Sequence, residues 1–216
     1  PKAASRQVSI GGRPVTVTGI SKGAGMIRPN MATMLGFMAT DANIKPELLQ
    51  ALVTEAANLS FNRITIDGDT STNDACVMAA TGQAGVVLSP ASPHWPLFAQ
   101  AVQAVCDSLA QAIVRDGEGA TKFVMVQING GASTDECLRA AYAIAESPLV
   151  KTALFASDPN WGRILAAVGR SGMENLDTRR IDIYLNAVQI VSAGGRAASY
   201  TEEQGQAAMR ETDITI

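Results

Sequence analysis

The sequence holds one histidine, His94, and three cysteines in 216 residues. Cys76, Cys106 and Cys137 lie far apart, and the chain has neither a CxxC pair nor a cluster of cysteine with histidine. These absences exclude a structural zinc site and indicate three reduced thiols that pack as small apolar groups. A Ser-His-Asp triad is not expected either, because His94, the one histidine, lies in a predicted surface loop and is a poor candidate for a base.

Charge is also scarce, since charged residues make up 17% of the chain and hydrophobic residues 47%, with a formal net charge of -3. A weakly acidic chain gives no indication of binding to nucleic acid or to an anionic membrane surface. The apolar runs are short and interrupted, so neither a transmembrane span nor a secretory signal is predicted. So few charges are typical of a chain that has a large core or hides surface against a partner chain, and composition leaves both possibilities open.

Hydrophobic periodicity predicts strands and helices that alternate along the chain. Helices are expected over residues 45–58, 95–114, 133–146, 161–168 and 201–210. Strands are expected in a hairpin over residues 7–20 and over residues 63–66, 75–81, 122–128, 181–185, 188–191 and 213–216. Residues 122–128 are apolar on both faces and are predicted to be central in a sheet. The length suits one large or two small domains, and the order of elements favours an α/β or α+β sandwich with helices outside the sheets.

Three polar clusters fall in predicted loops. Residues 67–74, DGDTSTND, match the odd positions of a calcium loop, but Thr72 replaces its glycine and Met78 its bidentate glutamate. The cluster is either a turn that bonds its own backbone or a rim of polar groups beside a substrate. Residues 157–163, SDPNWGR, indicate the start of a helix, with Asp158 near its cap and Pro159 in its first turn.

The third cluster, residues 115–122, places Glu118 between Gly117 and Gly119. It is not a phosphate loop, because the glycine spacing is wrong and no Gly-Lys-Ser/Thr follows. Glu118 is either an ordinary exposed turn residue or a carboxylate positioned to bind an ammonium group.

A lone hydroxyl, Thr33, follows the glycine-rich turn that carries Lys22. If the bond between Ala32 and Thr33 were cut, the threonine would gain an α-amino group with a pKa near 8. That amine could remove the proton of the same residue's hydroxyl and create a nucleophile without a histidine. The alternative is an ordinary core threonine.

Four stretches resemble, in order, motifs of the ornithine acetyltransferase family, which acts in arginine biosynthesis. They are KGAGMIRPNMATMLGFMATDA, DGDTSTND, DGEGATK and SPLVKTALFASDPNWGRILAAVGRSG. The resemblance covers nearly the whole chain. It implies a four-layer α/β/β/α sandwich and a precursor that cuts itself between Ala32 and Thr33 into pieces that stay together as an α2β2 heterotetramer. Residues 1–32 would then end the α chain, and residues 33–216 would form most of the β chain.

The resemblance also implies a reaction and its residues. The new N-terminal Thr33 would accept an acetyl group from N2-acetyl-L-ornithine and pass it to L-glutamate, while Lys22 and Glu118 contact the substrate. Acetyl-CoA is a possible further donor, and no metal or tightly bound cofactor is implied. The enzyme would be cytoplasmic.

Some parts of the family's site have no counterpart here. The resemblance places the oxyanion hole, a Thr-Gly pair, upstream of residue 1, and a substrate-binding Asn and Ser/Thr beyond Ile216. Since oxyanion donors commonly contribute about a hundredfold or more in rate, we expect this portion alone to be a poor catalyst. Two alternatives stay open: an N-terminal-nucleophile aminopeptidase or amidohydrolase, and a non-catalytic assembly module.

Overall fold

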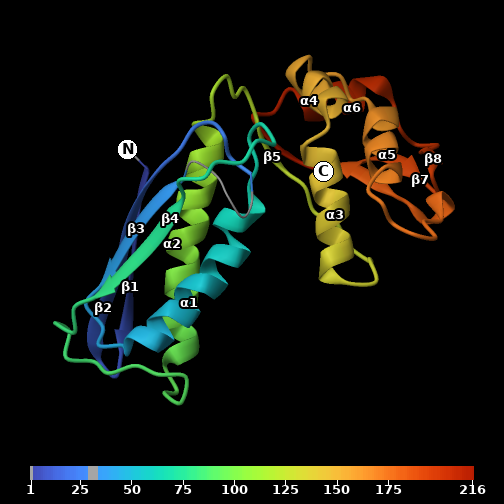
Figure 1. Ribbon diagram of the computed structural model, residues 1–216. Coiled ribbons are helices and arrows are strands. Elements are labelled where there is room, and N and C mark those ends of the chain that lie inside the picture. Colours follow the sequence, from blue (N-terminus) through green and yellow to red (C-terminus); the bar gives the residue numbers. More distant parts are fainter. Residues whose placement is uncertain (1, 29–33) are drawn as a thin grey trace. The chain divides into compact units, whose positions relative to one another are not determined.

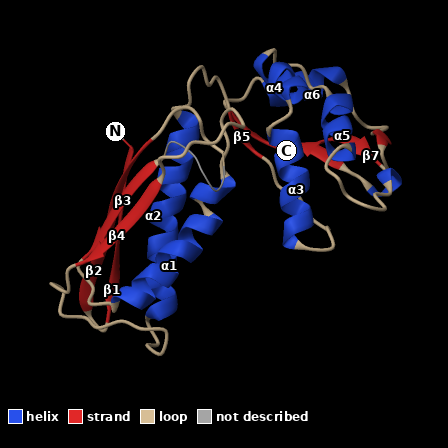
Figure 2. Ribbon diagram, viewed as in Figure 1, coloured by secondary structure: helices blue, strands red, loops and turns tan. Residues whose placement is uncertain are grey.

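The computed structural model describes residues 2–28 and 34–216. The chain divides into two compact units, Pro1–Glu118 and Gly119–Ile216. Each unit has its own hydrophobic core of buried side chains, so of the two arrangements that the length allows, two small domains is the one observed. Helices and strands occur in both units (Figure 2), which confirms the α+β class.

The first unit is built on a four-stranded sheet in the order β1-β2-β3-β4. Its strands are β1 (Lys2–Ile10), β2 (Arg13–Lys22), β3 (Leu35–Thr40) and β4 (Ala75–Ala80). Strand β2 is antiparallel to both β1 and β3, and β3 and β4 are parallel. Figure 1 shows α1 (Pro46–Leu59) and α2 (Trp95–Arg115) packed along one face of this sheet.

Local sequence explains these elements. The β1–β2 hairpin turns at Gly11 and Gly12, whose φ angles of 57° and 82° are those of a two-residue turn that needs positive φ at both positions. Helix α2 buries the predicted stripe completely, because its apolar residues recur every three or four positions. The stripe consists of Phe98, Val102, Val105, Leu109 and Ile113.

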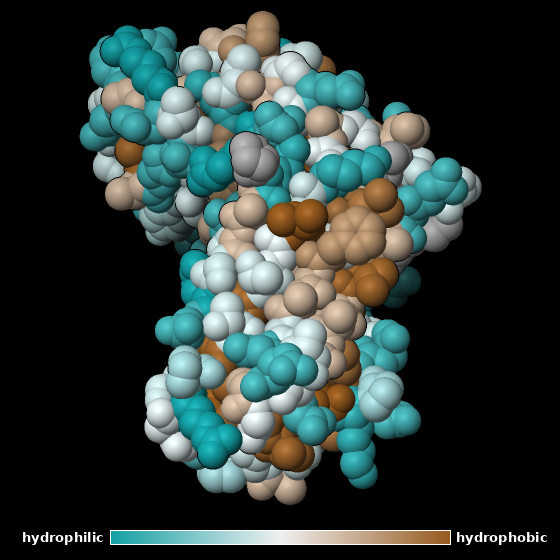
Figure 3. All heavy atoms as spheres, turned by 90° about the vertical axis from the view of Figure 1, so that its left-hand side faces the viewer, coloured by the Kyte–Doolittle hydropathy of each residue, from teal (hydrophilic) through white to brown (hydrophobic). Residues whose placement is uncertain are grey.

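The other face of this sheet carries apolar side chains that the first unit leaves exposed. Ile20, Phe37 and Val77 are direct neighbours across β2, β3 and β4, and they are 58%, 48% and 51% exposed. Figure 3 shows brown and tan side chains gathered in a band on the face of the molecule that holds this sheet. Successive residues of a strand point to opposite faces, so the sheet has one apolar face against helices and a second apolar face open to solvent.

The second unit has two small sheets. Strands β5 (Phe123–Met125) and β9 (Asp213–Thr215) are parallel, and β6 (Ile183–Leu185), β7 (Val188–Ser192) and β8 (Gly195–Arg196) form an antiparallel sheet. Asn186 connects the sheets from the β6–β7 turn, because its amide donates to the Thr215 carbonyl and its side chain accepts from the Thr215 amide.

Four helices complete the second unit, and each begins at a side-chain cap. They are α3 (Thr134–Ala145), α4 (Pro148–Phe155), α5 (Trp161–Gly169) and α6 (Glu202–Met209). The predicted capping box of α6 is present in full. In α3, Ser133 caps the amide of Glu136 as predicted, but the Glu136 carboxylate accepts from Ala132 instead of Ser133. Helix α4 was not predicted from periodicity.

Two strand predictions were wrong in part. Residues 63–66 form no strand: a 3-10 turn, Phe61–Arg63, leads into a loop whose Ile66 amide bonds the Ile27 carbonyl. Of residues 122–128, only Phe123–Met125 form a strand, which within the described part of the chain pairs with β9 alone. Val124 and Val126 contact the core while Met125 is exposed, so this segment buries one face and is not central.

Helix α2 is the one described helix that is long and apolar enough, by length and composition alone, to cross a membrane. Its apolar stripe lies in the core of the first unit, and the core helix of a folded unit meets the same criteria.

The buried cysteine of α2 gives a test of this core. Cys106 is fully buried, and its thiol lies 3.3 Å from the Met38 sulfur. Burial raises the pKa of the Cys106 thiol to about 12. Since the thiolate is the reactive form, a raised pKa leaves little of it at pH 8. We predict that iodoacetamide at pH 8 modifies Cys106 far more slowly than the half-buried Cys137 in the native protein, as followed by peptide mass spectrometry. The difference should vanish in urea, and equal native rates would contradict this packing.

Candidate functional site

The site lies where β2 ends and the chain turns through glycines. A cavity of about 440 Å³ opens there, within the first unit. Its lining comes from the start of β1, the turn after β2 and the loops that contain residues 67 and 118. The lining residues are Lys2, Lys22, Gly23, Ala24, Gly25, Met26, Asp67 and Glu118. Lys22 and Glu118, the two substrate-contacting residues that the family resemblance implied, therefore line one cavity although they are far apart in sequence.

Glu118 is held against the glycine turn by its backbone and by close packing. Its amide donates to the Ala24 carbonyl over 2.8 Å. A methyl group on Gly25 would lie only 3.1 Å from the Glu118 carboxyl carbon. The carboxylate thus approaches the turn as closely as it does because residue 25 has no side chain.

Asp67 fixes the shape of the same turn. Its carboxylate accepts the amide of Met26 at 2.7 Å and the amide of Ile27 at 3.2 Å. Met26 has a φ of 50°, in the left-handed region that residues other than glycine rarely adopt. The two hydrogen bonds offset the cost of that conformation, and a third accepted bond, from the Asp69 amide, holds Asp67 in its own loop.

The cations of the cavity have different surroundings. Lys2 forms an ion pair with Asp116, and this contact lowers the pKa of the Asp116 carboxyl. Among the described residues, neither Lys22 nor Glu118 has an ion-pair partner. A cation and an anion on two sides of a glycine turn suit a zwitterionic ligand, with its carboxylate toward Lys22 and its ammonium group toward Glu118.

The pairing of β2, β3 and β4 brings Lys22 close to the end of the polar loop. Lys22 is opposite Leu35, and Leu35 is opposite Ala75. The Asp74 carboxylate accepts the Met34 amide at 2.8 Å. Burial raises the pKa of Asp74 above its ordinary value, while the hydrogen bond from Met34 and the charge of Lys22 act in the opposite direction.

Residues 67–74 thus bond their own backbone and also the segments beside the cavity. The interpretation as a self-bonded turn is borne out by the Asn73 amide, which donates to Ser71. The bonds to Met26, Ile27 and Met34 were not predicted, because they depend on strand pairing between distant parts of the chain. No group of three or more acidic, cysteine or histidine side chains able to hold a metal ion occurs in the described ranges.

The predicted nucleophile and cleavage site, Thr33 and Ala32, lie outside the described residues. Their assignment stays a prediction. The described ranges end at residue 28 and resume at residue 34.

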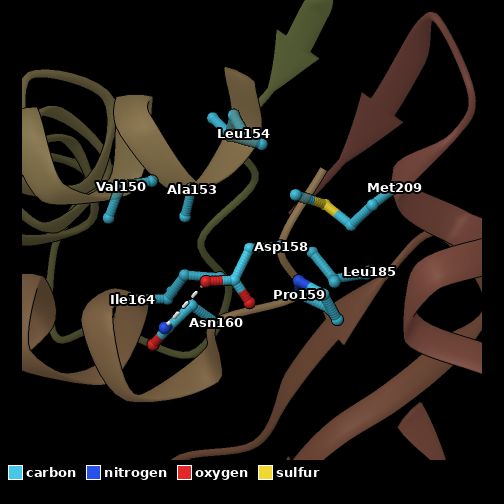
Figure 4. A pocket seen from close by; sticks show the side chains of 9 residues that line it. All are labelled: Val150, Ala153, Leu154, Asp158, Pro159, Asn160, Ile164, Leu185 and Met209. Atoms are coloured by element: carbon cyan, nitrogen blue, oxygen red, sulfur yellow. Dashed lines mark hydrogen bonds between the residues drawn. The ribbon is translucent and has the colours of Figure 1, made fainter. Parts of the chain in front are cut away.

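The SDPNWGR motif serves the fold of the second unit. Asn160, and not Asp158, caps α5, and Pro159 precedes the cap instead of standing in the first turn. Figure 4 shows Asp158, Pro159 and Asn160 around a small cavity with apolar walls, where the Asn160 side chain donates to Asp158. The cavity volume of about 10 Å³ has room for about one water molecule.

The comparisons with known proteins decide the family. The ArgJ family model matches residues 1–216, the whole chain. This chain belongs to the ArgJ family. This match confirms the resemblance found in the sequence motifs.

Curated relatives match over the full chain. Two are the arginine biosynthesis bifunctional proteins ArgJ of Pseudomonas syringae pv. tomato and Pseudomonas fluorescens, both 61% identical over 218 residues. That of Psychrobacter arcticus is 58% identical over 219 residues. Each alignment covers 100% of this chain and 54% of the relative, so the chain spans about half the length of the curated relatives it matches.

A solved structure supports the fold. The crystal structure of the ArgJ protein from Bacillus halodurans aligns with a TM-score of 0.80 at 42% identity, over 85% of this chain and 87% of that chain. The α+β fold is therefore one that an ArgJ protein has been shown to adopt.

The contact between Gly25 and Glu118 can be tested by a single methyl group. In Gly25→Ala the new carbon would lie 3.1–3.3 Å from the Glu118 carboxyl atoms, so the exposed Glu118 side chain has to move by a few tenths of an ångström. Gly36→Ala is the matched control, since its methyl would meet atoms only at 3.5 Å and beyond. We predict that the side-chain NMR resonances of Glu118 shift in Gly25→Ala and stay in place in Gly36→Ala. Unchanged resonances in both variants would show that the Glu118 carboxylate does not lie against the turn.

Proposed function

We propose that this chain is the nucleophile-bearing portion of a self-processing glutamate N-acetyltransferase of arginine biosynthesis. The observation that carries the proposal is the cavity that Lys22 and Glu118 share beside the segment leading to Thr33. The relatives' names place those proteins in arginine biosynthesis and call them bifunctional, which agrees with this activity.

The proposed reaction has two acyl-transfer steps. The Thr33 hydroxyl oxygen attacks the acetyl carbonyl carbon of N2-acetyl-L-ornithine, the amide C–N bond breaks, and ornithine leaves after its nitrogen takes up the proton from the hydroxyl. The amine of L-glutamate then attacks the acetyl-Thr33 ester, and the threonine oxygen recovers a proton. The free α-amino group of Thr33, formed by cleavage after Ala32, would carry the proton in both steps.

The charges of the cavity suit both substrates of this exchange. An α-carboxylate, which acetylornithine and glutamate share, would lie toward Lys22. The side-chain ammonium group of ornithine would lie toward Glu118, whose carboxylate lies beside Gly25. Holding a substrate by two charged ends orients its acetyl carbonyl for attack, and orientation contributes strongly to acyl-transfer rates.

The upstream part of the precursor is the proposed partner. About half of each curated relative lies outside the stretch that this chain covers. The apolar sheet face around Ile20, Phe37 and Val77 suits a second sheet packed face to face, as in the four-layer α/β/β/α arrangement. We propose that the α-chain portion covers this face and supplies the oxyanion hole, in an α2β2 assembly in the cytoplasm. Acetyl-CoA is proposed as a second donor, with no bound cofactor or metal.

Two other functions make different predictions. An N-terminal-nucleophile aminopeptidase would release free amino acids from peptides and would not acetylate glutamate. An assembly module would stay inactive after mixing with the upstream portion, whereas a split acetyltransferase would regain activity.

Replacement of the nucleophile tests the proposal directly. In the full-length precursor, Thr33→Ala should abolish both chain cleavage and acetyl transfer, because the attacking oxygen and the new α-amine are lost together. Intact-mass measurement reports cleavage, and chromatography of N-acetylglutamate reports transfer. Thr40→Ala, at a buried threonine that ends β3, is the control and should leave cleavage in place. Transfer at the native rate by Thr33→Ala would overturn the assignment.

Charge removal in the cavity should act mainly on binding. We predict that Glu118→Gln raises KM for acetylornithine at least about tenfold, since a charge-assisted hydrogen bond contributes roughly 1.5–3 kcal/mol. The same change should affect KM for glutamate less, because glutamate has no side-chain ammonium group. Lys22→Met should raise both KM values. Steady-state kinetics of full-length variants check this pattern, and equal effects of Glu118→Gln on both substrates would contradict the proposed orientation.

A further inference from the structure

Two aspartates of one loop hold the chain on both sides of the segment that carries the proposed cleavage site. Asp67 and Asp74 are the first and last residues of the loop DGDTSTND. Asp67 bonds the backbone at Met26 and Ile27, and Asp74 bonds it at Met34. In sequence, the bond between residues 32 and 33 falls between these two attachments.

The upstream attachment has three backbone hydrogen bonds. The Asp67 carboxylate accepts from Met26 at 2.7 Å and from Ile27 at 3.2 Å, and the Ile27 carbonyl accepts from the Ile66 amide at 2.9 Å. The same turn lines the cavity with Gly25 and Met26. This attachment therefore connects the chain before the proposed cleavage site to the substrate cavity.

The downstream attachment is a reciprocal pair at the start of two parallel strands. The Met34 amide donates to the Asp74 carboxylate at 2.8 Å, and the Met34 carbonyl accepts from the Ala75 amide at 3.1 Å. Leu35 and Ala75 then begin the pairing of β3 with β4. Asp74 is half-buried, and burial raises the pKa of its carboxyl, while the hydrogen bond from Met34 and the charge of Lys22 act in the opposite direction. Met34 directly follows Thr33 in the sequence, and its backbone amide and its backbone carbonyl are thus both hydrogen-bonded.

We propose that Asp67 and Asp74 are positioning residues for self-cleavage and acetyl transfer, each holding one side of the bond that is cut. The inference rests on the proposed function of Thr33. Before cleavage, two fixed ends restrict the conformations open to the residues between them, which favours the geometry of attack. After cleavage the two aspartates hold different pieces. Asp67 bonds the piece that contains the cavity turn and ends at Ala32, and Asp74 bonds the piece that begins with Thr33.

This division gives the two aspartates different kinetic effects. We expect Asp74→Ala to slow self-cleavage at least about tenfold, the change expected when a hydrogen bond to a charged group is lost, and to lower kcat per cleaved chain with little change in KM. Asp67→Ala should also slow cleavage, but in the cleaved enzyme it should raise KM for acetylornithine. Asp74→Asn retains an acceptor for the Met34 amide and should cleave within about threefold of the native rate.

The experiment uses the full-length precursor and follows cleavage by intact mass and transfer by steady-state kinetics on the cleaved fraction. Asp69→Asn is the matched control, because it removes a charge from the same exposed loop where no bond to residues 26, 27 or 34 is made. Its rates should equal the native rates. Thermal unfolding midpoints show whether any variant fails to fold.

The outcomes separate the two ideas. If Thr33→Ala is inactive and uncleaved while Asp74→Ala cleaves and turns over like Asp69→Asn, the positioning role is wrong and the proposed function stands. If Asp74→Asn is as impaired as Asp74→Ala, the hydrogen bond to Met34 is not the cause and the inference is overturned. Native transfer by Thr33→Ala would instead overturn the function on which the inference rests.

Discussion

One row of strand pairing determines where the chemistry of this chain can occur. Lys22, Leu35 and Ala75 are neighbours across β2, β3 and β4. Because β3 and β4 are parallel, the segment before Leu35 and the loop before Ala75 approach the same end of the sheet, and β2 brings Lys22 to that end. The position of Lys22 at the cavity and the hydrogen bond from the Met34 amide to Asp74 both depend on this register. A shift of β2 by one residue would move Lys22 to the other face of the sheet.

The scarcity of charge in the sequence has a structural counterpart. The first unit uses one face of its sheet to pack against α1 and α2, and Ile20, Phe37 and Val77 are exposed on its other face. Large exposed apolar patches on folded units usually mark surfaces that bind another chain. Of the two explanations that composition left open, the two hydrophobic cores are observed, and a partner chain over the apolar sheet face is what we propose.

Local patterns were enough to predict the elements that depend on neighbouring residues. The Gly11-Gly12 hairpin, the stripe of α2 and the capping box of α6 are all encoded within a few positions of sequence. Strand β3 was not predicted, because its Met- and Ala-rich sequence has no strong alternation and becomes a strand by pairing with β2 and β4. Residues 63–66 show the reverse case, with β-branched residues that form a loop because no neighbouring strand pairs with them.

The site shows the same division between local and distant information. The family resemblance selected Lys22 and Glu118, and the fold brings them to one cavity. The roles of Asp67 and Asp74 could not be predicted, since each bonds the backbone about forty residues away. The motif begins and ends with aspartate, which hints at two similar roles. The sequence alone, however, does not show that Asp67 bonds Met26 and Ile27 or that Asp74 bonds Met34.

The central claim is that residue 33, released by cleavage, carries the acetyl group within reach of the Lys22 and Glu118 cavity. The most direct measurement is the intact mass of native full-length protein mixed with N2-acetyl-L-ornithine and quenched before any glutamate is added. The account predicts that the piece beginning at Thr33 gains the mass of one acetyl group and loses it when glutamate follows. An uncleaved chain that still transfers acetyl groups, or an acetyl group attached elsewhere, would contradict it.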